Sequence, residues 1–97
     1  MIKRIVRMRF RKKKVQDFLA IFRESCTAIR AFEGCMYLEL LQDADDPTVY
    51  STLSIWSSPE ALEAYRRSDL FRETWKRTKK LFRKDAQAWS MTSYVIV

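Results

Sequence analysis

Histidine is absent from this 97-residue chain, and glycine occurs only once, at Gly34. Without histidine there is no imidazole base, no histidine ligand for a metal ion and no proximal histidine for haem. A phosphate-binding loop or a dinucleotide-binding turn needs several glycines so that the backbone can approach the phosphate. The sequence therefore excludes P-loop nucleotide hydrolysis and a Rossmann-type site.

Long apolar runs and abundant cysteine are lacking too. No stretch approaches the ~20 apolar residues that span a bilayer, so we expect no membrane partner. Residues 1–5 alternate charged and apolar side chains, whereas a signal peptide has a continuous apolar segment. We interpret the two cysteines, Cys26 and Cys35, as reduced packing residues, and we predict a cytoplasmic localisation.

An acidic stretch at residues 43–47 resembles a calcium loop only superficially. It lacks the glycine and the later glutamate of an EF-hand loop, so we expect no metal site. Its Asp and Pro residues are typical of a turn between two strands.

Basic residues are in excess, and the net charge is +7. Residues 1–14 hold eight Lys and Arg and no acid, and residues 66–84 hold nine Lys and Arg against two acids. Such asymmetry attracts an anionic ligand or a nucleic acid, or keeps the protein in solution. Because the aromatic motifs of RNA-binding sheets are missing, nucleic acid is the less favoured partner.

The hydrophobic pattern predicts four strands. They cover residues 2–10, 35–41, 48–56 and 88–97. In the first of them, apolar residues such as Val6 and Met8 alternate with basic ones such as Arg7 and Arg9. This period of two is that of a strand with one buried face.

Two helical regions separate these strands. The first carries an apolar stripe at helical spacing, formed by Val15, Phe18, Leu19, Phe22, Cys26 and Ile29. Gly34 suits the left-handed position that follows a helix. The second region begins either at a capping box, Ser57 with Glu60, or at Ser58 followed by proline. It restarts at Ser68–Asp69 and is predicted to run to Arg83.

The order β-α-β-β-α-β predicts an α+β fold of the ferredoxin-like type, as one domain over residues 1–97. Such a fold has a four-stranded antiparallel sheet with two helices on one face. The other face should be polar if it meets water. Here both faces carry large apolar residues, for example Leu53 and Ile55 on one side and Tyr50 and Trp56 on the other. We therefore predict a homodimer that packs sheet against sheet.

The middle of the chain carries landmarks in register along a strand end and the helix that follows it. They are Ser54-Ile55-Trp56, Ser58-Pro59-Glu60-Ala61-Leu62, Tyr65 and Ser68-Asp69-Leu70-Phe71. With this arrangement the chain resembles, over nearly its whole length, the antibiotic biosynthesis monooxygenase (ABM) family of the dimeric α+β barrel superfamily. The resemblance implies a dimeric barrel built from two such domains.

The resemblance also implies a choice of chemistry. Some members oxygenate quinols or phenols without metal or flavin, because the substrate anion supplies the electrons; others degrade haem. In the haem-degrading branch a histidine stands four residues after the phenylalanine that corresponds to Phe71, and this chain has Trp75 there. An asparagine that this branch has on the first strand is also missing. Haem degradation is therefore not expected, and we predict no cofactor. Quinone-forming members have an asparagine four residues before the tryptophan that corresponds to Trp56, and this chain has Thr52 there.

Four residues are candidates for binding a substrate between helix and sheet. Trp56, Phe71 and Trp75 offer flat aromatic surfaces, and Thr52 offers a hydroxyl to a phenol. Phe71 and Trp75 share a helix face with Phe82, so the alternative is that this stripe is simply core.

Charged candidates are less well defined. A basic stripe formed by Arg72, Lys76, Lys79 and Arg83 is either a solvated helix face or, with Arg7 or Arg9, a means of stabilising a phenolate. Of these, Arg9 is taken as the substrate-binding candidate. Four tyrosines are possible proton donors: Tyr37, Tyr50, Tyr65 and Tyr94. A general base is not evident beyond a carboxylate such as Glu39, so the catalytic residues stay unassigned.

Two hypotheses of different classes follow. The first is a cofactor-independent monooxygenase acting on a small aromatic or quinol-like substrate. The second is a non-catalytic, ligand-binding homodimer of the same fold. Oxygen consumption with a panel of quinols separates them.

Overall fold

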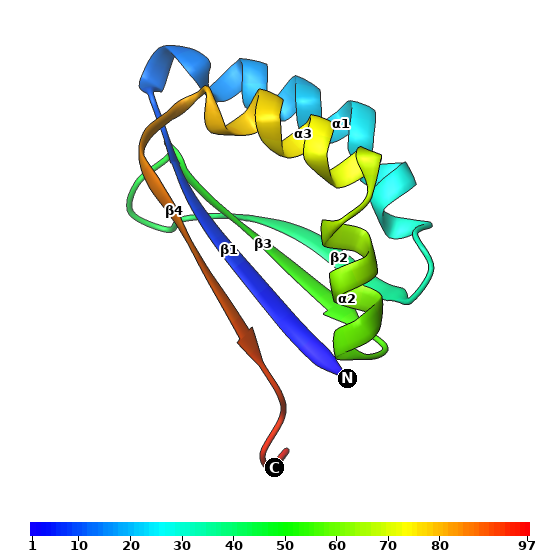
Figure 1. The fold of residues 1–97 in the computed structure, drawn as a ribbon. Coiled ribbons are helices and arrows are strands. Elements are labelled where there is room, and N and C mark those ends of the chain that lie inside the picture. Colours follow the sequence, from blue (N-terminus) through cyan, green and yellow to red (C-terminus); the bar gives the residue numbers. More distant parts are fainter.

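The computed structural model describes all residues from Met1 to Val97. In chain order the elements are β1 (Ile2–Phe10), a 3-10 turn η1 (Lys12–Lys14), α1 (Val15–Arg30), β2 (Cys35–Gln42), β3 (Val49–Trp56), α2 (Pro59–Arg66), α3 (Asp69–Lys79) and β4 (Phe82–Met91). The strands form one sheet in the order β2-β3-β1-β4, and every neighbouring pair is antiparallel. All helices lie on one side of this sheet (Figure 1). The predicted ferredoxin-like α+β fold is confirmed.

The inner face of the sheet, which the helices cover, follows the period of two along β1. Register pairs Val6 with Thr52 and Met8 with Tyr50, and these residues face the helices. Because side chains alternate across a strand, Arg4 lies on the same face as Val6 and Met8. Arg7 and Arg9 lie on the outer face.

Serine caps divide the second helical region into α2 and α3. The Ser58 side chain accepts a hydrogen bond from the backbone N–H of Ala61 at 3.0 Å, and Pro59 opens α2. Of the two predicted starts, the serine followed by proline is the one that forms. Ser68 caps α3 in the same way, accepting from the N–H of Phe71 at 3.1 Å. Each cap satisfies an N–H that has no partner inside its helix.

The last strand differs from its prediction. It runs from Phe82 to Met91 instead of over residues 88–97, and α3 ends at Lys79 instead of Arg83. The reason is pairing: β4 lies beside β1 from Phe10 opposite Phe82 to Lys3 opposite Met91. Since β1 begins at residue 2, no strand remains beside residues 92–97, which lie outside the sheet.

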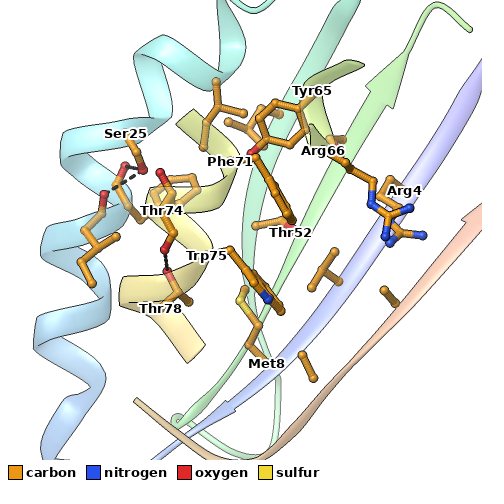
Figure 2. Close-up of a pocket in the computed structure, with 18 of the residues that line it drawn as sticks. Arg4, Met8, Ser25, Thr52, Tyr65, Arg66, Phe71, Thr74, Trp75 and Thr78 are labelled. Carbon is orange, nitrogen blue, oxygen red and sulfur yellow. Dashed lines mark hydrogen bonds between the residues drawn. The ribbon is translucent and has the colours of Figure 1, made fainter. Parts of the chain in front are cut away.

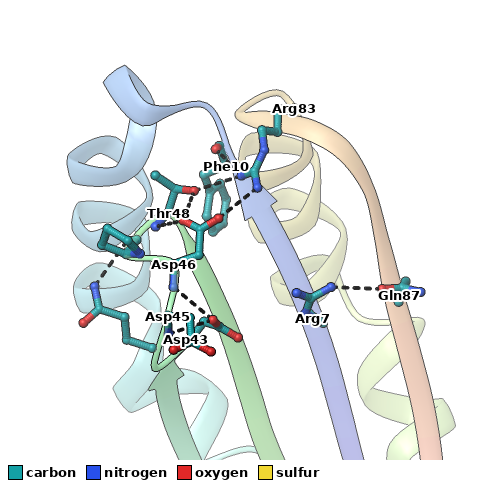
Figure 3. Close-up of polar contacts among 10 residues, drawn as sticks. Arg7, Phe10, Asp43, Asp45, Asp46, Thr48, Arg83 and Gln87 are labelled. Atoms are coloured by element: carbon teal, nitrogen blue, oxygen red, sulfur yellow. Dashed lines mark hydrogen bonds and ion pairs between the residues drawn. The ribbon is translucent and has the colours of Figure 1, made fainter.

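Arg83 therefore belongs to β4 and not to a basic stripe on a helix. It takes part in a network of hydrogen bonds at the end of the sheet (Figure 3). Its guanidinium donates to the Phe10 carbonyl and to Thr48 Oγ1, each at 2.9 Å, and contacts Asp46 Oδ2 at 3.3 Å. The Thr48 hydroxyl donates to Asp46 Oδ1 at 2.7 Å. These bonds hold the β2–β3 turn against the start of β4.

The core consists of two clusters rather than one. The first contains Met8, Phe10, Phe18 and Tyr50, and the second contains Cys35, Trp56 and Leu62. On α1 the buried positions are Phe18, Ile21, Ser25 and Ile29, so the buried stripe passes through Ile21 and Ser25, whereas Cys26 is only half-buried. Gly34 has φ of +87°, as its predicted left-handed position requires.

The outer face of the sheet carries no helix (Figure 1). It exposes large apolar side chains. Trp89 and Met91 on β4 are 44% and 47% exposed, and Tyr37 and Leu41 on β2 are 41% and 40% exposed. Both faces of the sheet are thus apolar in part, as the sequence indicates. None of the helices has the length and apolar character needed to cross a membrane.

Candidate ligand-binding cavity

A cavity of about 340 Å³ lies between the inner face of the sheet and the helices, between the two core clusters (Figure 2). Its wall is mostly apolar, with Met8 and Phe18 from one cluster and Trp56 and Leu62 from the other. A volume of this size is at the lower end of the ~300–1,000 Å³ typical of pockets that enclose small molecules.

The cavity opens to solvent at one end. Among the residues that line it, Arg66 and Ala88 alone are exposed, while Arg4 beside them is half-buried. At the opposite end the wall is closed by Ser25 and Thr78 (Figure 2). The hydroxyls of these two residues are already used, because they donate to backbone carbonyls of their own helices at 2.8 and 2.7 Å.

Trp56, the tryptophan at the end of β3, forms part of the cavity wall and is 0% exposed to solvent. Its indole N–H donates to Ser54 Oγ at 2.9 Å, so this donor is satisfied within the protein. The ring stacks on Tyr65 with centroids 4.7 Å apart. Trp56 thus offers an apolar surface and not a hydrogen bond.

Phe71 and Trp75 reach the cavity from successive turns of α3. Their rings stack nearly parallel, at 10°, with centroids 5.9 Å apart. Trp75 also meets Phe82 of β4 edge-on at 5.6 Å, so its ring is held on two sides. Trp75 packs against the first core cluster and also lines the cavity. Its ring therefore borders open space as well as core.

Thr52 lines the cavity from the middle of β3, between Arg4 and Met8 in Figure 2. Its hydroxyl makes no hydrogen bond within the protein, so it is free to bond a ligand. Of the five residues predicted to bind substrate, the structure thus brings four to one cavity: Thr52, Trp56, Phe71 and Trp75.

Arg9 is the exception. It lies on the outer face of the sheet, and its guanidinium donates to the Asp85 carbonyl at 2.9 Å. Alternation along β1 explains this position, because odd-numbered residues point away from the helices. The basic groups that line the cavity are instead Arg4 and Arg66.

Tyr65 is the one tyrosine at the cavity. Tyr37 donates to Glu39 at 2.8 Å, Tyr50 accepts from Gln42 at 3.0 Å, and Tyr94 is fully exposed. Burial, with a smaller effect of the neighbouring Cys35, raises the pKa of Tyr65 to about 12. Its hydroxyl therefore stays protonated at neutral pH and has no partner within the protein.

Sequence reasoning did not single out Arg4 or Arg66. The side of the sheet on which Arg4 lies could be predicted from alternation, because Arg4 precedes Val6 by two residues and Met8 by four on β1. That Arg66 lines the cavity could not be predicted, because its position depends on how α2 lies over the sheet. No carboxylate lines the cavity, and no three Cys, Asp or Glu side chains gather closely enough to hold a metal ion.

Solved structures of similar fold cover almost the whole chain. They include a conserved protein from Methanosarcina mazei (21% identity, 93% of this chain and 89% of that one, TM-score 0.89) and an antibiotic biosynthesis monooxygenase (20%, 98% and 100%, 0.92). A protein from Mycobacterium tuberculosis is equally similar (19%, 98% and 96%, 0.90). At such identities the similarity establishes the fold alone.

Among curated proteins no sequence match is found. The family model for antibiotic biosynthesis monooxygenase matches residues 1–77, from β1 through most of α3. That range contains Thr52, Trp56, Phe71 and Trp75. The chain is a member of the antibiotic biosynthesis monooxygenase family.

Proposed function

We propose that this protein binds a small aromatic or quinol-like molecule in the cavity and oxygenates it without metal or flavin. The observation that carries the proposal is the cavity itself. Its wall on the side of β3 and α3 contains three aromatic rings, those of Trp56, Phe71 and Trp75. Flat apolar walls favour a flat apolar ligand. Three hydroxyls without protein partners, those of Thr52, Tyr65 and Thr74, remain for its polar groups.

The proposed reaction uses the substrate as the electron donor. An ionised phenol gives two electrons to dioxygen and forms a C–O bond at a ring carbon. Loss of the proton from that carbon then supplies the second pair of electrons, which breaks the O–O bond and turns C–H into C=O. One oxygen atom stays in the new carbonyl and the other leaves as water with two hydrogens, so that phenol and O₂ give quinone and water. No reductant other than the substrate is needed.

Charge at the cavity suits an anionic substrate. With no carboxylate or imidazole in the wall, no side chain there takes up the phenol proton, so the substrate arrives ionised or loses its proton to water. The positive field of Arg4 and Arg66 favours the ionised form. The protonated hydroxyl of Tyr65 donates a hydrogen bond to the anion, which stabilises it further.

Oxygen uptake with a panel of quinols and phenols tests this function, with labelled dioxygen to show that one atom enters the product. Ala86→Leu, which places extra carbons on the cavity wall, should lower turnover by about tenfold or more. Ala20→Leu is the matched control, because the same change occurs on an exposed position of α1. Equal turnover in the two variants contradicts the assignment of the cavity as active site.

The alternative is a non-catalytic homodimer that holds the same kind of ligand. Its support is that the wall contains no general base. Binding of quinols without label in any product, and without oxygen uptake above that of the free quinol, favours this second function.

We further propose that two copies pack through their outer sheet faces. Trp89 and Met91 on β4 and Tyr37 and Leu41 on β2 supply the apolar contact area. Sedimentation should give a dimer at micromolar concentration. Trp89→Lys should yield monomers, and Ala28→Lys on the exposed side of α1 should not. A reducing compartment such as the cytoplasm suits the two free thiols, Cys26 and Cys35.

A further inference from the structure

Two arginines lie next to each other at the mouth of the cavity (Figure 2). Arg4 extends from the inner face of β1 and makes one hydrogen bond, from Nη1 to Ser90 Oγ at 2.9 Å. No carboxylate contacts it. Arg66, from the last turn of α2, reaches Glu63 only at 3.8 Å, whereas Glu63 makes a closer contact of 3.0 Å with Arg67. The positive charge at the mouth is therefore largely unneutralised.

This arrangement costs free energy in the empty protein. Partial burial and, to a smaller extent, the charge of Arg66 lower the pKa of Arg4, because both disfavour the protonated guanidinium. A second cation beside a half-buried one is ordinarily offset by an acid, and here the chain supplies only Glu63, which lies 3.8 Å from Arg66 and is shared with Arg67. An anion that enters from solvent reduces the repulsion between the two guanidinium groups. It also accepts hydrogen bonds that these groups do not make within the protein.

We propose that the ligand of this cavity is a flat aromatic carboxylate whose carboxylate binds Arg4 and Arg66 at the mouth. The inference rests on the proposed function only in taking the same cavity as the ligand site. Guanidinium groups match the two oxygens of a carboxylate. A carboxyl group, with pKa of about 4, is fully ionised at neutral pH, whereas a phenol of pKa about 10 is not.

Placing the carboxylate at the mouth also orients the ring. The apolar body then points inward, toward Trp75 and the free hydroxyl of Thr52 (Figure 2). The ring substituent that reacts is thus separated from the group that is recognised. Binding energy at the arginines then positions the ring in the cavity.

Three naphthalene probes that do not turn over test the inference: 2-naphthoate, its methyl ester and 2-naphthol. Binding is followed at neutral pH by quenching of tryptophan fluorescence and by calorimetry. We expect 2-naphthoate to bind about tenfold to a hundredfold more tightly than the ester or the naphthol, and to lose this advantage as salt is raised.

Variants assign the preference to the arginines. Arg4→Gln and Arg66→Gln should each remove most of it, while Arg4→Lys keeps the charge and part of the preference. Arg72→Gln is the control, because Arg72 is an exposed arginine of α3 that neither lines the cavity nor contacts Glu63. Melting temperatures show that each variant is folded, and Arg66 lies on an exposed helix surface where the substitution is tolerated.

The outcomes separate the two proposals. Equal binding of acid, ester and naphthol, or a preference that survives in both Arg→Gln variants, overturns the carboxylate inference and leaves the proposed function standing. Failure of all three probes to bind overturns the cavity as a ligand site, and both proposals with it. Binding of 2-naphthoate with the expected preference supports the inference even if quinols are not oxygenated.

Discussion

Tyr65 should make the stability of this protein fall steeply in strong alkali. Its hydroxyl borders the cavity, and burial raises its pKa to about 12 in the folded state. In the unfolded chain a tyrosine has a pKa of about 10. Between these values the unfolded state has released the proton and the folded state has not, so unfolding becomes more favourable as pH rises.

The magnitude follows from the shift. A difference of about 2 pKa units corresponds to about 3 kcal/mol of the free energy of unfolding. This contribution is fully present below about pH 10 and is lost as pH rises toward about 12. Because other groups titrate in the same range, the quantity of interest is the difference between wild type and Tyr65→Phe.

Urea unfolding followed by circular dichroism measures that difference from about pH 9 to about pH 12. Wild type should lose about 3 kcal/mol more than Tyr65→Phe across this range. The hydroxyl has no partner within the protein, so the variant should fold normally at neutral pH. Tyr94→Phe is the matched control, because Tyr94 is fully exposed. Parallel stability curves for wild type and Tyr65→Phe would refute the reasoning.

Three further changes test other parts of the structure. Gly34→Ala should lower the free energy of unfolding by more than about 1 kcal/mol, since φ is +87° and a new Cβ would collide with the Ala61 side chain; chemical denaturation measures this. Ser58→Ala should cost about 1 kcal/mol by removing the cap of α2, while Ser57→Ala, at an exposed neighbour, should cost less. Hydrogen bonds from Thr48 lower the pKa of Asp46, so the stability they add is present above about pH 4 and lost as pH falls below it; Asp46→Asn should flatten this acid limb of the unfolding curve.

The fold was predictable because its signals are local. Period-two alternation located β1 from Ile2 to Phe10, and serine caps located the starts of α2 and α3. The last strand was misplaced because residues 88–97 are as apolar as a strand and nothing local shows where the partner ends. The length of β1 decides that β4 stops at Met91.

The candidate site was predictable where the family motif places residues, and less so elsewhere. Thr52, Trp56, Phe71 and Trp75 reach one cavity, while Arg9 points to the opposite side of the sheet. Strict alternation along β1 already assigns Arg9 to that side. The same rule would have drawn attention to Arg4.

By itself, the sequence determined the order of helices and strands, the apolar character of both sheet faces and the absence of histidine chemistry. These depend on residue type and on spacing along a single strand or helix. The tertiary structure alone decided which of four tyrosines reaches the cavity, that Arg66 joins Arg4 at its mouth, and that the core leaves open space between two clusters. Such features depend on how α2 and α3 lie across the sheet, and that angle is set by side chains far apart in the chain.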